Sequence, residues 1–74
     1  PSIDQLRIFL AVVQEGSFGR AAKRMGRAVS AVSYGIAQME AQLGVELFDR
    51  EGSRRPALTE AGRGLLAEAR AVAD

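Results

Sequence analysis

The sequence contains no cysteine and no histidine. These absences exclude disulfides, thiolate chemistry and zinc sites of the usual kinds. Histidine is also the usual general base near neutral pH, so the commonest acid–base catalyst is missing. The carboxylates are scattered singly along the sequence, with no acidic cluster to hold a metal, and there is no phosphate-binding Gly-x-x-x-x-Gly-Lys-Ser loop. The sequence therefore predicts a protein that is not an enzyme and that uses no metal or other cofactor.

Long apolar segments are missing as well. No run approaches the roughly 18 residues of a membrane span, and no signal-peptide pattern opens the chain, so a cytoplasmic location is expected. The 74 residues predict one small domain with a single modest core. Hydrophobic residues nevertheless make up 47% of the chain, which indicates either a dense core or an apolar surface that meets a partner.

Charge is nearly balanced overall but is segregated along the chain. The formal net charge is +1. One run of cations contains no acid, and a second cluster is diluted only by a glutamate. The first consists of Arg20, Lys23, Arg24 and Arg27, and the second of Arg50, Arg54 and Arg55. Two basic patches fit directed contacts with phosphates, and they fit ordinary solvated helix faces equally well.

Apolar periodicity predicts four helices and a short hairpin. The first two helices begin at serine caps and end at glycines, the third starts near residue 28 or 29, and the last follows a threonine cap. The expected elements are helices over about 3–15, 18–25 and 29–43, strands at 47–48 and 57–58, and a last helix after residue 59.

The third helix combines an inward apolar stripe with an outer face of small or flat side chains. When a short turn joins two helices, the second can lie in the DNA major groove while the first crosses the backbone. On the outer face, Ser30 and Ser33 can bond to base edges or phosphates, and Ala31 can touch a thymine methyl. Tyr34 can hydrogen-bond a phosphate or pack against a sugar. The candidate base-reading residues are Val29, Ser30, Ala31, Ser33, Tyr34 and Ala37.

Two positions on this helix leave alternatives open. Tyr34 can contact DNA, or it can be a surface tyrosine that covers neighbouring apolar atoms. Gly35 costs about 1 kcal/mol in a helix interior relative to alanine. A close approach of DNA or of a neighbouring helix would explain this glycine, and so would simple tolerance of a weak helix.

The candidate backbone contacts are arginines outside the third helix. Arg27 flanks the turn between the two helices, where it would position the protein on phosphates. Arg50 follows the first strand, where an arginine can grip a phosphate. Arg54 and Arg55 lie near the tip of the hairpin, and arginines in such a wing can enter a narrow minor groove or simply solubilise the turn.

Taken in order and in register, these features resemble the N-terminal winged helix-turn-helix domain of LysR-type transcriptional regulators. The resemblance covers nearly all of the chain. It is carried by Leu6-Arg7-Ile8-Phe9, Glu15-Gly16-Ser17-Phe18, Ala21-Ala22, Val32-Ser33, Ile36, Met39-Glu40, Leu43-Gly44-Val45-Glu46-Leu47-Phe48, Arg50 and Leu58-Thr59-Glu60-Ala61-Gly62. The resemblance implies a mainly α fold, with a three-helix core, a two-stranded wing and a C-terminal linker helix. It implies a DNA-binding domain over 1–58 and the start of the linker helix over 59–74, with the effector-binding domain absent from this chain.

The resemblance also implies partners. It indicates a bacterial transcription factor, at the nucleoid in the cytoplasm, that binds an interrupted palindrome as a homodimer or higher homo-oligomer. Two recognition helices would then lie about one DNA turn apart, roughly 34–36 Å. A small-molecule effector would act only through the absent domain. The linker-helix residues implied in dimerisation are Leu66, Ala69, Val72 and Ala73, whereas Ala61 and Leu65 are expected to pack on their own domain.

The start of the third helix departs from the family pattern. Where the family usually has Ser-Gln-Pro-Ala, this chain has Ala28-Val29-Ser30-Ala31, and Tyr34 replaces a common arginine or histidine. Alanine gives up the capping side chain unless Ser30 or a water compensates, and valine removes a glutamine that family members use on bases. Family expectations about which bases are read therefore do not transfer.

Two rival functions remain at this point. The modest net charge and the apolar Val29 permit a winged helix that is used for protein–protein contact. A nonspecific architectural DNA binder is the other rival, although that function favours more positive charge than +1.

Overall fold

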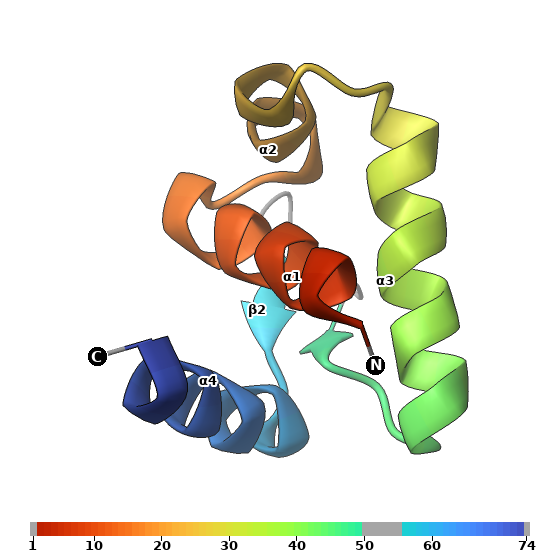
Figure 1. Cartoon of the computed structure of the whole chain (residues 1–74). Coiled ribbons are helices and arrows are strands. Elements are labelled where there is room, and N and C mark those ends of the chain that lie inside the picture. The colour runs from red at the N-terminus through yellow and green to blue at the C-terminus, as the bar shows by residue number, and fades with distance from the viewer. Residues whose placement is uncertain (1, 50–55, 74) are drawn as a thin grey trace.

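The computed structural model describes residues 2–49 and 56–73, with the last two of these described by their helix alone. The elements follow in the order α1 (Ile3–Glu15), α2 (Phe18–Met25), α3 (Val29–Leu43), β1 (Phe48–Asp49), β2 (Ala57–Leu58) and α4 (Glu60–Ala73). Figure 1 shows α1 crossing the middle of the molecule, with α2 above it, α3 along one side and α4 below. This arrangement confirms the predicted mainly α fold with a helix-turn-helix and a two-stranded wing.

Local capping explains where the first two helices begin. Ser2 and Gln5 form the predicted capping box, because the Ser2 hydroxyl accepts from the Gln5 amide at 3.1 Å and the Gln5 side chain accepts from the Ser2 amide at 2.9 Å. The Ser17 hydroxyl accepts from the Arg20 amide at 2.9 Å. Both helices end at glycines with left-handed backbone, as the sequence predicts.

The core forms where α1, α2 and α3 meet. Phe9, Ile36 and Met39 are fully buried, and the Phe9 ring lies 5.4 Å from that of Phe48. No polar or charged side chain is buried among the described residues. The buried hydrophobic side chains among the described residues are those of Ile8, Phe9, Ala11, Val12, Ala21, Ala22, Val32, Ile36, Met39, Leu47 and Phe48. Because each large side chain contributes about 1.5–3 kcal/mol on burial, this cluster fixes α3 against its neighbours.

Gly35 lets α3 approach α1 closely. A Cβ atom added at Gly35 would lie 2.8 Å from the Cδ1 atom of Ile8, closer than real Cβ atoms come to other heavy atoms, so the buried Ile8 side chain would have to shift. A neighbouring helix, one of the alternatives that the sequence left open, therefore explains this glycine.

The base of the wing is tied to both α3 and α4. The antiparallel strands pair Phe48 with Leu58 and Asp49 with Ala57. The first strand was expected at 47–48 and begins one residue later, because the Leu47 amide donates at 2.7 Å to the Glu40 carboxylate on α3. The predicted cap of α4 is confirmed, since the Thr59 hydroxyl accepts from the Gly62 amide at 3.0 Å.

Candidate nucleic-acid interface

The outer face of α3 brings most of the candidate base-reading residues together. Tyr34 is 64% exposed and Val29 is 49% exposed. Ser30, Ala31 and Ala37 are exposed on the same helix, and Ser33 is half-buried. Among the helices and strands that the structure describes, Figure 1 shows none on the outer side of α3. The core packing thus leaves a face of short, neutral side chains open to a partner.

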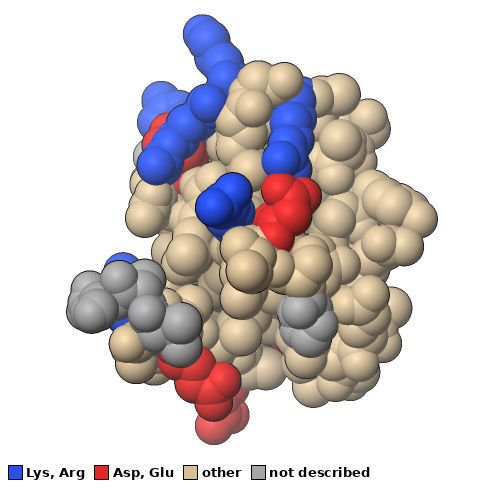
Figure 2. Space-filling model, in the orientation of Figure 1, with Lys and Arg blue, Asp and Glu red and all other residues tan. Residues whose placement is uncertain are grey.

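This face carries no positive charge. Glu40 is the single charged residue in the sequence of α3, and it binds amides at the base of the wing. Figure 2 shows Lys and Arg gathered toward the α2 end of the molecule, while the surface over the outer side of α3 carries neither sign of charge. Ion pairs with phosphates must therefore come from elements beside α3.

Two polar side chains, Tyr34 and Gln38, form a hydrogen-bonded pair on this face, and only Tyr34 was predicted from the sequence. The Gln38 side-chain nitrogen donates to the Tyr34 hydroxyl at 2.8 Å. The outer face predicted from the sequence covers residues 29–37, so it ends one residue before Gln38. The four-residue spacing was the available signal, since side chains at i and i+4 are neighbours on a helix.

Arg27, a candidate phosphate contact, is engaged with α1. Its guanidinium donates two hydrogen bonds to the Asp4 carboxylate, at 2.7 and 3.0 Å. The hydrogen bond from Arg27, aided by its charge, holds the pKa of Asp4 below its ordinary value, and the same bond raises the pKa of Arg27. The pair ties the turn between α2 and α3 to the start of α1. The role of Arg27 on DNA stays a prediction.

The remaining cations of the first run divide into two kinds. Arg24 donates to Gln14 at 2.6 Å and forms an ion pair with Glu15 at 3.3 Å, so it is held against the end of α1. Arg20 and Lys23 are exposed on α2. The second basic cluster, Arg50, Arg54 and Arg55, lies outside the described residues.

The start of α3 has no side-chain cap. Ala28 occupies the N-cap position with extended backbone, and no side chain bonds to the first turn. Backbone bonds from Ala31 and Val32 to the Ala28 carbonyl, at 3.0 and 3.2 Å, form the first turn instead. The expected loss of the cap is thus confirmed, and Ser30 does not compensate for it.

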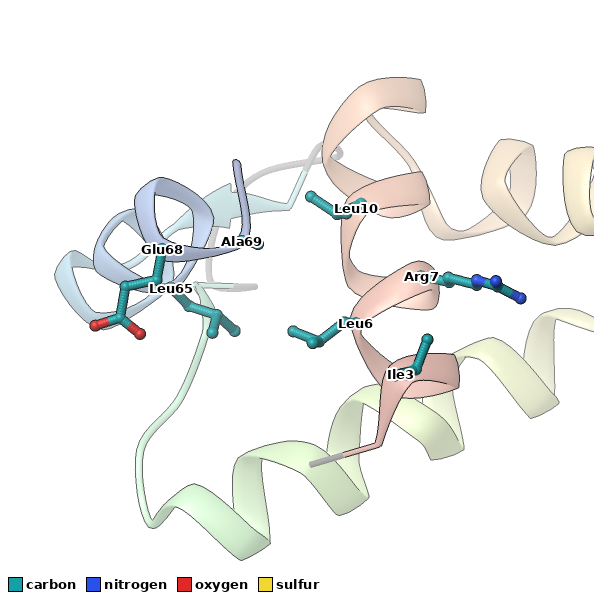
Figure 3. Close-up of a pocket in the computed structure, with 7 residues that line it drawn as sticks. All are labelled: Ile3, Leu6, Arg7, Leu10, Leu65, Glu68 and Ala69. Atoms are coloured by element: carbon teal, nitrogen blue, oxygen red, sulfur yellow. The ribbon is translucent and has the colours of Figure 1, made fainter. Parts of the chain in front are cut away.

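The residues implied in dimerisation lie on α4. Leu65 and Leu66 are partly buried and pack against the core of their own domain, as was expected only of Leu65. Ala69 lines a groove of about 380 Å³ between α1 and α4, together with Leu6 and Leu10. Figure 3 shows the Leu65 side chain facing Leu6 across this groove. The side chains of Val72 and Ala73 lie outside the described residues.

Within the described residues, no helix combines the length and apolar character that crossing a membrane requires. The same part of the chain contains no group of three or more His, Cys, Asp or Glu residues that could hold a metal ion.

The chain is similar to known bacterial regulators. A family model described as "Bacterial regulatory helix-turn-helix protein, lysR family" matches residues 3–63. A "Probable RuBisCO transcriptional regulator" from Trichormus variabilis is 52% identical over 65 residues, which cover 88% of this chain and 19% of that protein. The "Uncharacterized HTH-type transcriptional regulator YfeR" from Shigella flexneri is 45% identical over 64 residues, covering 86% and 20%. The chain thus spans about a fifth of the length of these relatives.

Solved structures show the same fold. The structure titled "Crystal Structure of BenM_DBD/catB site 1 DNA Complex" superposes with a TM-score of 0.91 at 35% identity, covering 97% of this chain and 80% of that chain. The "Crystal structure of CbnR_DBD-DNA complex" gives 0.89 at 35% identity, with 97% and 82% covered. The family model matches more than half of this chain, so the chain belongs to the lysR family of bacterial regulatory helix-turn-helix proteins.

Proposed function

We propose that this chain is the DNA-binding part of a bacterial transcription regulator and that it binds double-stranded DNA sequence-specifically. The observation that carries the proposal is the outer face of α3, which is exposed, neutral and held rigidly by the core beneath it. Family membership and the titles of the solved relatives, which name complexes with DNA, support it. In this proposal α3 lies in the major groove and α2 crosses the backbone.

Phosphate contacts come from around α3. Arg20 and Lys23 on α2 are exposed and available to the backbone on one side. On the other side, Arg50, Arg54 and Arg55 of the wing would contact the backbone or enter the minor groove. Such contacts position the protein without reading sequence, and base contacts from α3 then supply specificity.

Dimerisation would follow from α4. In this proposal residues 1–58 form the DNA-binding domain and 59–74 begin a linker helix that pairs with a second copy. Leu66, Ala69, Val72 and Ala73 are the proposed contacts, and the partly open groove beside Ala69 supports an apolar interface there. The dimer would bind an interrupted palindrome, at the nucleoid, and a small-molecule effector would act through a separate domain.

A selection from a random duplex DNA library tests this proposal. The chain is expected to enrich an interrupted palindrome with half-sites about one turn apart. Salt-sensitive binding without an enriched sequence would support an architectural binder instead. No binding even at low salt would support the rival in which the winged helix contacts another protein.

The wing is tested by the salt dependence of binding. Arg54→Ala is expected to weaken binding to many sequences similarly and to reduce the slope of log K against log salt by about 0.9 for each bound protomer, the value for one lost phosphate contact. Arg70→Ala, an exposed arginine on α4, is the matched control and should leave the slope unchanged. A loss confined to one base position would show that Arg54 reads a base.

A further inference from the structure

The Tyr34–Gln38 pair differs from everything around it on α3. Both side chains are exposed, and a hydrogen bond of 2.8 Å joins them. Helical side chains lean toward the N-terminus of their helix, so Gln38 lies over the turn that carries Tyr34. The exposed neighbours on the same side are Ser30, the alanines at 31, 37 and 41, and Gln42. Between Ser30 and Gln42, Tyr34 and Gln38 are therefore the longest side chains that the face offers to a partner.

The hydrogen bond leaves Gln38 with a defined set of free groups. A side-chain amide has two N–H donors and one carbonyl acceptor. The Tyr34 hydroxyl takes one of these donors. One N–H and the carbonyl oxygen remain, and recognition of a base requires that this N–H be the one cis to the carbonyl, so that the two lie side by side on one edge of the amide. Adenine presents the complementary pair in the major groove, an acceptor at N7 and a donor at N6, whereas guanine presents two acceptors.

The tyrosine also restrains the amide before any DNA is bound. Fixing a flexible side chain on binding costs entropy, and a side chain already held in place loses less. The Tyr34 ring thus acts as a support for Gln38, and its own O–H donor stays available for a phosphate or a base acceptor.

No competing reader of guanine is present on α3. Arginine and lysine make the commonest specific contact with guanine, and α3 contains neither. The nearest arginine in sequence, Arg27, is bonded to Asp4. Among the side-chain amides on this helix, Gln38 is distinguished by the hydrogen bond that already holds it against Tyr34.

We propose that Tyr34 and Gln38 act as one unit that reads an adenine in each half-site, with Gln38 contacting the base and Tyr34 positioning its amide. This inference rests on the proposed function. It adds a specificity-determining residue, Gln38, and assigns the base that this residue recognises.

The test measures which base pair depends on the unit. Binding sites are selected with the wild-type chain, and its affinity is then measured for every single base-pair change in one half-site. The variants are Gln38→Ala, Tyr34→Phe and the double variant. Gln42→Ala, which removes another exposed glutamine one turn further along α3, is the control. Melting temperatures close to wild type establish that these surface changes leave the fold intact.

The wild type is expected to prefer A·T at one position by about 10- to 100-fold, the usual range for a bidentate contact. Gln38→Ala should abolish the preference at that position and leave the others unchanged. Tyr34→Phe should reduce it several-fold at the same position, and the double variant should lose no more than Gln38→Ala alone. Such non-additive losses are the signature of two side chains acting together.

A change of specificity provides a second test. Gln38→Glu replaces the donor–acceptor edge with a carboxylate, which accepts from the cytosine N4 group. The preferred pair at the same position should therefore change from A·T toward C·G.

Three results would overturn the inference while leaving the proposed function intact. These are an equal loss of affinity for all sequences in Gln38→Ala, effects of Tyr34→Phe at a different base pair, and an effect of Gln42→Ala as large as that of Gln38→Ala. If the wild type enriches no sequence at all, the proposed function and the inference fail together.

Discussion

Replacing Gly62 with alanine is expected to destabilise the domain, although the same change normally stabilises a helix. Gly62 is buried in the first turns of α4, at the place where this helix meets the base of the wing. A Cβ atom added there would overlap with the carbonyl oxygen of Leu47 and would lie 2.9 Å from the Cδ2 atom of Leu58. The obstacle is mostly backbone, which cannot rotate away as a side chain can.

The backbone at Leu47 is held from two sides. Its carbonyl accepts from the Thr59 amide at 3.0 Å, and its own amide donates to the Glu40 carboxylate at 2.7 Å. Relief of the overlap must strain or break one of these bonds, or displace α4. Overpacking of this kind costs about 1–3 kcal/mol, and more where the structure cannot relax, whereas the gain in helix propensity is about 1 kcal/mol. We expect Gly62→Ala to lower the free energy of unfolding by about 1–2 kcal/mol.

Gly64 provides the matched control on the same helix. It is exposed, and an added Cβ atom would meet nothing within 4 Å. Gly64→Ala should therefore gain up to about 1 kcal/mol from helix propensity alone. The two variants should differ by about 2–3 kcal/mol, which corresponds to roughly 10 °C or more in melting temperature for a domain of this size. Thermal unfolding followed by circular dichroism measures the difference. A Gly62→Ala variant that melts at or above Gly64→Ala would refute the reasoning.

Three further predictions concern residues at the ends of helices. Ala28→Ser restores a capping side chain to a residue whose backbone is already extended, and it should raise the free energy of unfolding by about 1 kcal/mol; a melting temperature no higher than wild type would contradict this. Asp4→Asn removes the charged partner of Arg27. If the released arginine contacts one phosphate, the salt slope of DNA binding should steepen by about 0.9 for each bound protomer, whereas an unchanged slope would show that Arg27 gains no such contact. Arg27 lowers the pKa of Asp4 in the folded protein. The contribution of this pair to stability should therefore be complete above the ordinary Asp pKa of 3.8 and be lost as the pH falls below it. NMR titration of the Asp4 carboxyl in folded and denatured protein measures the shift.

The elements of this fold were predictable because their signals are local. The serines at 2 and 17 accept from amides three residues later, and the glycines at 16, 26 and 44 take the left-handed backbone that ends a helix. Each of these features depends on a few adjacent residues, so composition and spacing reveal it. The one-residue shift of β1 has a different origin, since the bond from Leu47 to Glu40 on α3 is tertiary.

The site was only partly predictable, because its decisive contacts join distant positions. Arg27 was expected to be a cation available to DNA, and the structure pairs it with Asp4, 23 residues earlier in the chain. Periodicity can place Arg27 beside a turn, but it cannot show which carboxylate lies across from that turn. Gly35 posed the same difficulty, since only the packing of Ile8 decides between the helix and the DNA as its neighbour. Gln38 was within reach of sequence reasoning, because its partner lies one helical turn away.

The distribution of charge implies that affinity and specificity reside on different elements of this domain. The outer face of α3 is neutral, so under the proposed function it adds little to the electrostatic attraction of DNA. That attraction must come from α2, where Arg20 and Lys23 are exposed, and from the wing. Changes on α3 should then alter which sequence is preferred at a constant salt slope, and changes to the cations should alter the slope at a constant preference. The Asp4–Arg27 ion pair lies at the turn between α2 and α3. The Asp4→Asn variant should therefore show whether Arg27 belongs with the cations that set the salt slope.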